Sequence, residues 1–226
     1  MSKEKIISIV ALIAVLGGVA VLGFWGYNKT DKEVATTVQN VATVNGVGIT
    51  QTTYDSQLAS VIATLKTQGI DTENADNLNK IKTQTLNDVI NNELVVQGVA
   101  KAGIKIADAD VEAQYQRLVT EAGGADKLKE QLTIANLTEA QFRENISKQL
   151  AIQAYLLQNI DVSTATATDA EAKTFYDTNV KGQTGAPAYK DIVEQIKQQI
   201  VANKQQLLIN TFLVTLREKS TIETSL

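Results

Sequence analysis

Residues 188–220 read AYKDIVEQIKQQIVANKQQLLINTFLVTLREKS. Apolar residues recur in this segment at intervals of mostly three, four and seven, which is the period of an α-helix. Pro187 stands just before it, where a helix tolerates proline. A helix of this length spans about 50 Å and cannot bury its own apolar stripe. We therefore predict that earlier helices of the chain pack along it.

The composition favours a helical protein with an aliphatic core, and it excludes several kinds of active site. The 226 residues are 44% hydrophobic but only 5% aromatic, with a single proline, no cysteine and no histidine. A Ser-His-Asp or Cys-His catalytic site is therefore impossible, as is a zinc site with histidine or cysteine ligands. The net charge of −4 argues against a nucleic-acid partner. The sequence predicts no catalytic residue, no metal site and no cofactor.

An uncharged segment near the N-terminus predicts a transmembrane anchor. Residues 6–27 carry no charge, and as a helix they would span about 33 Å, which matches the hydrocarbon core of a bilayer. Trp25 and Tyr27 lie where interfacial aromatic residues are expected. A cleaved signal peptide is the alternative, but its apolar region usually has about 7–15 residues. We expect an uncleaved single-pass anchor in the cell membrane, with residues 1–5 in the cytoplasm and the main domain outside it.

The sequence after the anchor predicts a tether, a hairpin and a series of helices. Residues 28–40 are polar and predict a short tether. Asn45-Gly46, flanked by β-branched residues, is typical of a tight hairpin turn. We expect Thr50 and Asp108 to cap helices. Helical periodicity, caps and glycine stops predict helices over about 51–68, 78–102, 108–122, 125–134, 139–157, 169–176 and 188–220, and Ile222 is a candidate for a short last strand.

Two helix starts carry a more specific signal. Thr138-Glu-Ala-Gln141 and Thr168-Asp-Ala-Glu171 have the spacing of capping boxes, in which a threonine and a Gln or Glu three residues later cap each other's amide. Both predict the start of a helix.

Several of these segments resemble one protein family in their order and spacing. Residues 41–50, VATVNGVGIT, resemble the opening strand and turn of the SurA/PrsA/PpiD-like extracytoplasmic chaperones. Residues 86–94, LNDVINNEL, resemble the second helix of that family. Residues 106–115 and 137–142 are similar to the helix starts that follow, and residues 168–179 resemble the helix that leads into a parvulin domain.

The resemblance implies a split helical domain over residues 41–226, in which residues 41–180 pack with the final helix and tail, residues 188–226. In the family a parvulin isomerase is inserted between the two segments, whereas residues 181–187 stand in its place here. The first and last short strands of the family often pair, which would join 41–44 to 221–223. We therefore expect a mainly α fold with a minor strand pair and no enzymatic activity.

The resemblance also implies a holdase for unfolded exported polypeptides; the alternatives are an adaptor for one specific protein partner and a residual prolyl isomerase. Binding of clients would need apolar surface that stays exposed after the domain closes. We select Tyr155, Phe175, Tyr176 and Tyr189 as candidate peptide-binding residues, because aromatic side chains anchor partners well and these lie near the point where the two segments meet. Burial in the core is the competing explanation for all four.

Overall fold

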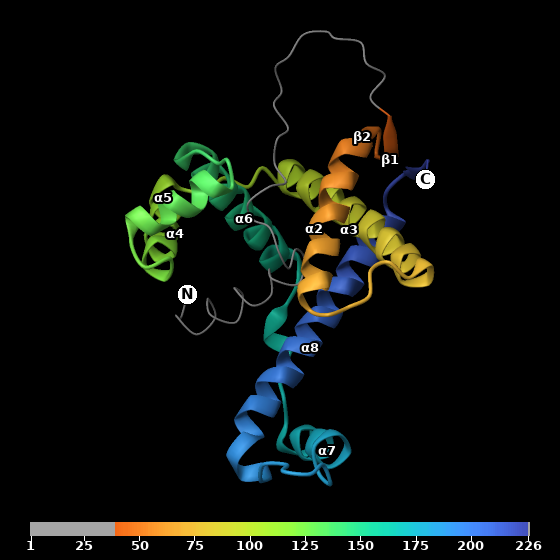
Figure 1. Ribbon diagram of the computed structural model, residues 1–226, viewed down its shortest axis with the longest axis vertical. Coiled ribbons are helices and arrows are strands. Elements are labelled where there is room, and N and C mark those ends of the chain that lie inside the picture. The colour runs from red at the N-terminus through yellow and green to blue at the C-terminus, as the bar shows by residue number, and fades with distance from the viewer. Residues whose placement is uncertain (1–38, 226) are drawn as a thin grey trace.

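A computed structural model describes residues 39–225, which are arranged around a long C-terminal helix (Figure 1). The mainly helical fold that the sequence predicts is confirmed. In chain order the elements are β1 (Asn40–Val44), β2 (Val47–Thr50), α2 (Gln51–Thr67), α3 (Ala75–Ala102), α4 (Asp108–Glu121), α5 (Ala125–Ile134), α6 (Glu139–Asn159), the 3-10 turn η1 (Val162–Thr164), α7 (Asp169–Asn179), α8 (Tyr189–Glu218) and β3 (Ile222–Thr224).

The first and last parts of the described chain meet in an antiparallel sheet of order β2-β1-β3. Asn45 and Gly46 have φ values of 51° and 84°, so they form the tight turn between β1 and β2 that the sequence predicts. β3 pairs with the other edge of β1, with Val44 opposite Ile222. The predicted pairing of the first and last strands is therefore confirmed, and β1 is the central strand.

The side chain of Asn45 ties the hairpin turn to the end of α8. Its Oδ1 accepts a hydrogen bond from the backbone N–H of Thr221 (2.9 Å), and its Nδ2 donates to Gln97 Oε1 (2.8 Å) and to Ser220 Oγ (3.3 Å). Gln97, on α3, donates in turn to the backbone oxygen of Val44 (2.9 Å). These bonds join three segments that are far apart in the sequence.

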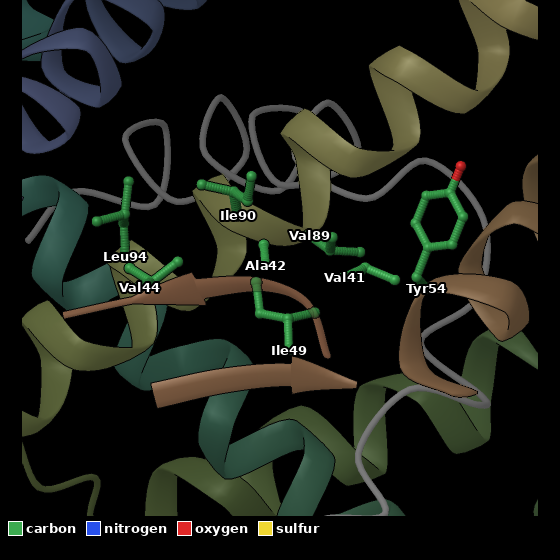
Figure 2. Packing of buried hydrophobic residues seen from close by; sticks show 8 residues of the cluster. All are labelled: Val41, Ala42, Val44, Ile49, Tyr54, Val89, Ile90 and Leu94. Carbon is green, nitrogen blue, oxygen red and sulfur yellow. The ribbon is translucent and has the colours of Figure 1, made fainter. Parts of the chain in front are cut away.

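The first core cluster lies between the sheet, α2 and α3. Figure 2 shows its side chains gathered between the two hairpin strands and α3, with Tyr54 of α2 at one end. Leu216 of α8 packs against this cluster from the side. The buried members are Val41, Ala42, Val44, Ile49, Tyr54, Val89, Ile90 and Leu94.

The second core cluster forms where α3, α6 and α8 meet. Ile209 of α8 is fully buried, and Leu213 lies one turn further along the same face. The prediction that earlier helices pack along the last helix is confirmed for this half of α8. The buried members are Val95, Tyr155, Leu156, Ile160, Ile209 and Leu213.

A third cluster forms a separate lobe from α4, α5 and the first half of α6 (Figure 1). The guanidinium group of Arg143 lies 3.8 Å from the centroid of the Tyr115 ring, and it pairs with Glu139 (2.8 Å) and Glu112 (2.5 Å). These contacts link α4 to α6 at the edge of the lobe. The buried members are Tyr115, Leu128, Leu132, Phe142 and Ile146.

The helix starts follow the predicted caps with one exception. Thr138 and Thr168 form complete capping boxes, and the Thr50 side chain caps α2. In α4, however, Ala107 occupies the N-cap position and Asp108 is the first helical residue. The predicted Asp108 cap is therefore wrong. The Asp108 carboxylate still lies in the first turn of α4. Its negative charge there is attracted to the positive, N-terminal end of the helix dipole.

Two helix boundaries extend beyond their predicted limits. α3 begins at Ala75 rather than near residue 78, because the Asn74 side chain accepts bonds from the amides of Asp76 and Asn77 and caps it. α7 continues to Asn179, past the predicted end near residue 176.

The predicted anchor, residues 6–27, lies outside the described residues, as does the predicted tether up to residue 38. Asn40, predicted as the last residue of the tether, is instead the first residue of β1. Over residues 39–225, no helix has the length and apolar character needed to cross a bilayer.

Candidate polypeptide-binding surface

α7 and the N-terminal half of α8 form a two-helix arm that projects away from the sheet and the clusters beside it (Figure 1). α7 packs chiefly against α8. Ala172 of α7 is fully buried, and Ile196 of α8 is only 4% exposed. The arm therefore has only a small apolar core of its own, and polar contacts contribute to holding it together.

Two ion pairs hold the start of α7 against α8. Lys197 Nζ lies 2.6 Å from Asp169 Oδ1, and Lys204 Nζ lies 2.5 Å from Glu171 Oε1. The other oxygen of Glu171 accepts the backbone N–H of Thr168 (2.9 Å) as part of the capping box. A single carboxylate thus caps α7 and binds α8.

The pKa of the Glu171 carboxyl is lowered to about 2, first of all by the hydrogen bond from Lys204. A carboxyl with a lower pKa in the folded chain stabilises the fold above its unfolded pKa, and that stabilisation is lost as the pH falls from about 4.5 toward 2. We therefore predict that α7 loosens in acid before the core clusters do. Hydrogen exchange, corrected for intrinsic rates, should show lower protection of the α7 amides at about pH 3 than at neutral pH.

Glu171→Gln provides the matched control for this acid response. Because glutamine does not titrate in this range, the variant should have weaker α7 protection at neutral pH and a smaller change in acid. Asp169 and Asp177, whose pKa values are lowered by Lys197 and Lys173, account for the remaining change. Equal acid responses in the two proteins would contradict the role of Glu171.

Three of the four candidate aromatic residues lie at the tip of the arm. The rings of Tyr176 and Tyr189 meet edge to face with centroids 5.3 Å apart. The Tyr176 hydroxyl donates to the backbone oxygen of Pro187 (2.9 Å), and that of Tyr189 donates to the backbone oxygen of Asp169 (3.4 Å). The Tyr176 bond therefore holds the loop before α8 against α7, and the Tyr189 bond holds the start of α8 against the start of α7. Phe175 and the two tyrosines all remain partly exposed.

Tyr155 lies apart from these three, in the second core cluster. It is 8% exposed, and its ring centroid is 5.8 Å from that of Phe212. It also faces Gly98 of α3 so closely that a Cβ at residue 98 would lie 2.3 Å from its hydroxyl oxygen. The predicted contact of Tyr155 with clients would need an exposed ring, whereas this side chain is buried. We therefore assign Tyr155 to packing between α3 and α6.

The outer face of the C-terminal half of α8 carries exposed apolar residues that the aromatic pattern does not reveal. Leu207 and Val214 are 64% and 54% exposed. Asn210 and Thr211 lie between them and are also exposed. The available signal in the sequence is the run 205–216, QQLLINTFLVTL, which has no charge on any side of the helix.

Comparison with known proteins identifies the family of this fold. The sequence profile of the SurA-like N-terminal domain matches residues 1–156. The chain belongs to the SurA-like N-terminal domain family. The match to the SurA-like domain ends within α6, so α7, α8 and β3 lie beyond it. α7 and α8 are joined directly by residues 180–188, and no parvulin domain is present within residues 39–225.

Relatives of this SurA-like chain are named as protein-folding factors. The foldase protein PrsA of Clostridium perfringens is 27% identical over 192 residues, which cover 79% of this chain and 53% of that protein. The chaperone SurA of Methylobacillus flagellatus is 26% identical over 167 residues, which cover 74% of this chain and 37% of that protein. The chain therefore spans about half the length, or less, of these curated relatives.

A solved structure shares the fold. It comes from a study of PEB4 and Cj1289, two structurally related SurA-like chaperones of Campylobacter jejuni. The TM-score is 0.55 at 16% identity, and the alignment covers 82% of this chain and 98% of that one. At this identity the similarity concerns the fold alone.

Proposed function

We propose that this protein is a membrane-anchored chaperone that holds unfolded exported polypeptides outside the cytoplasm and does not isomerise them. The observation that carries the proposal is a SurA-like body with a projecting arm whose tip bears three partly exposed aromatic side chains. The names of the relatives, foldase PrsA and chaperone SurA, support the same role.

The arm would bind clients through weak apolar contacts. The rings of Phe175, Tyr176 and Tyr189 offer apolar faces, while both tyrosine hydroxyls already bind backbone oxygens of this chain. Aromatic faces of this kind contact apolar side chains without selecting one sequence. Weak contacts of this type allow release without a nucleotide or another cofactor.

Residues 6–27 would hold the domain at the membrane, with residues 1–5 in the cytoplasm and the segment after 27 serving as a tether. We predict that deletion of residues 1–27 removes the protein from the membrane fraction of cells. Fractionation after an alkaline wash is the measurement, because the wash releases peripheral proteins but not integral ones. Retention of the shortened protein in the membrane fraction would contradict the anchor.

The holding activity predicts that residues 28–226 suppress the aggregation of a chemically unfolded client, measured by light scattering. Phe175→Ala combined with Tyr189→Ala should weaken this suppression several-fold, because both changes remove apolar surface from the arm tip. Ile134→Ala is the matched control, since it removes an apolar side chain that is 76% exposed on the separate α4–α5 lobe. The control should suppress aggregation as well as the unaltered protein does.

Three other outcomes would change the proposal. Absence of suppression at a several-fold molar excess of the protein would count against a holdase. Crosslinking in cells that captures one stoichiometric partner, rather than many exported chains, would favour an adaptor. A protease-coupled assay with a proline peptide should show no catalysis, and measurable catalysis would restore the isomerase alternative.

A further inference from the structure

The turn between β1 and β2 holds the one Asn-Gly dipeptide in the 226 residues, Asn45-Gly46. Asparagine followed by glycine is the pair most prone to spontaneous deamidation, because glycine has no side chain to hinder attack by its amide nitrogen on the carboxamide. Both residues are exposed to solvent, and a Cβ at residue 46 would meet no atom within 4 Å. Water and base therefore reach this dipeptide from outside.

In the closed domain, however, the Asn45 carboxamide is fully bonded. Its Oδ1 accepts the backbone N–H of Thr221, and its Nδ2 donates both of its hydrogens, to Gln97 and to Ser220. Two of these three partners belong to the segment that joins α8 to β3, which lies beside the hairpin (Figure 1). Deamidation expels Nδ2 and carries Cγ onto the Gly46 nitrogen, so it cannot proceed while these bonds persist.

From these contacts we infer that Asn45 is a modification site, which reacts with water when residues 220–225 detach from the hairpin. Detachment frees the carboxamide to turn toward the main chain. The deprotonated Gly46 nitrogen then forms a bond to Cγ, the Cγ–Nδ2 bond breaks, and ammonia leaves a cyclic imide. Water opens the imide at either carbonyl, which gives aspartate or isoaspartate at residue 45. The net reaction converts an amide and water into an acid and ammonia, with no oxidant or enzyme.

Gln97 prevents the aspartate product from restoring the closed arrangement. A carboxylate accepts hydrogen bonds but donates none, and the atom that replaces Nδ2 would lie 2.8 Å from Gln97 Oε1. Gln97 cannot turn its own amide to help, because its Nε2 donates to the backbone oxygen of Val44 (2.9 Å) and to Glu93 Oε1 (2.8 Å). Two oxygens would therefore face each other without a hydrogen between them, with the Glu93 carboxylate close by.

The isoaspartate product disturbs the main chain itself. It adds a backbone carbon between residues 45 and 46, in a turn whose φ values are 51° and 84° and whose flanking residues, Val44 and Val47, pair directly. Either product therefore leaves the end of α8 less firmly tied to the hairpin, and the change is permanent. The reaction involves no client, so the inference stands independently of the proposed chaperone role.

Deamidation kinetics of the full chain test the requirement for detachment. Peptide mapping by mass spectrometry measures the conversion of Asn45 during incubation in mildly alkaline buffer. Ile222→Ala trims a β3 side chain that packs against the first core cluster, so it should raise this rate several-fold. Ser220→Ala removes one acceptor without touching the core and should raise it by a smaller factor. The chain unfolded in urea should react fastest.

Ile134→Ala is the matched control for these rates. Residue 134 lies on the separate α4–α5 lobe, and its side chain is 76% exposed, so the variant should react at the rate of the unaltered protein. None of the three substitutions adjoins residue 45 in the sequence, so the intrinsic reactivity of the dipeptide is the same in all of them. Circular dichroism should show that each variant keeps its helical content.

Asn45→Asp tests the consequence of the reaction. The Ser225 N–H, which donates to the backbone oxygen of Val41 (2.9 Å), should lose hydrogen-exchange protection several-fold, while the amides of the α4–α5 lobe keep theirs. Asn45→Gly is the matched control, because glycine suits this turn and removes the same bonds without adding a charge. It should lose less protection than Asn45→Asp does.

Two sets of results would overturn the inference. The first is an equal rate of conversion of Asn45 in the folded and the urea-unfolded chain, or rates for Ile222→Ala and Ser220→Ala that match that of Ile134→Ala. The second is full protection of the Ser225 amide in Asn45→Asp, or protection no lower than in Asn45→Gly, since the modified chain would then still close.

Discussion

Ile209→Ala should lower the free energy of unfolding by about 2–5 kcal/mol. Ile209 is fully buried where α3, α6 and α8 meet, so truncation removes apolar contacts and leaves a cavity among three helices. A loss of this size is a large fraction of the stability of a typical domain, which is about 5–15 kcal/mol. Urea denaturation followed by circular dichroism measures the change.

Leu207→Ala is the matched control on the same helix. Residue 207 is 64% exposed, so its truncation should change the free energy of unfolding by no more than about 0.5 kcal/mol. If Ile209→Ala were as harmless as Leu207→Ala, α8 would not be docked on α3 and α6. The packing of residues 41–180 with the last helix would then be incorrect.

Gly98→Ala should destabilise the protein by about 1–3 kcal/mol, although the same change usually stabilises a helix interior by about 1 kcal/mol. Gly98 lies in α3 opposite Tyr155, and a Cβ there would lie 2.3 Å from the Cζ and hydroxyl oxygen of that ring. The ring is packed against Phe212, so it cannot move aside without disturbing the second core cluster. Helix propensity alone would make Gly98→Ala stabilising. A destabilising effect therefore indicates the close approach of the Tyr155 ring to Gly98.

A double-mutant cycle isolates this contact. Tyr155→Leu removes the end of the ring that meets Gly98, so Gly98→Ala should become neutral or stabilising in that background. Denaturation of the four proteins in urea gives the coupling free energy. A stabilising effect of Gly98→Ala in the unaltered protein would contradict the packing of Tyr155 on α3.

The parts of the fold that the sequence predicts well are those with local signals. Asn45-Gly46 specifies its turn through the backbone conformations it tolerates, and Thr138 and Thr168 mark helix starts through caps that need only neighbouring residues. The pairing of the first and last strands is not local, and only the family resemblance predicts it.

The candidate site is less predictable, because exposure depends on how helices cross. α8 has apolar residues on all sides over 205–216, so its period does not reveal which side faces the core. Leu208 packs against the second cluster while its neighbour Leu207 is exposed. Tyr155 is buried for a similar reason, since the glycine that accommodates its ring lies on a different helix.

The pairing of β1 with β3 also sets the order in which the domain can be completed. β1 is among the first described residues to leave the ribosome, but one of its edges stays open until residues 222–224 have been synthesised. An open strand edge is a template for pairing with other chains. The nascent protein therefore exposes an unpaired strand edge until residues 222–224 have been made, which is the kind of surface that chaperones usually protect.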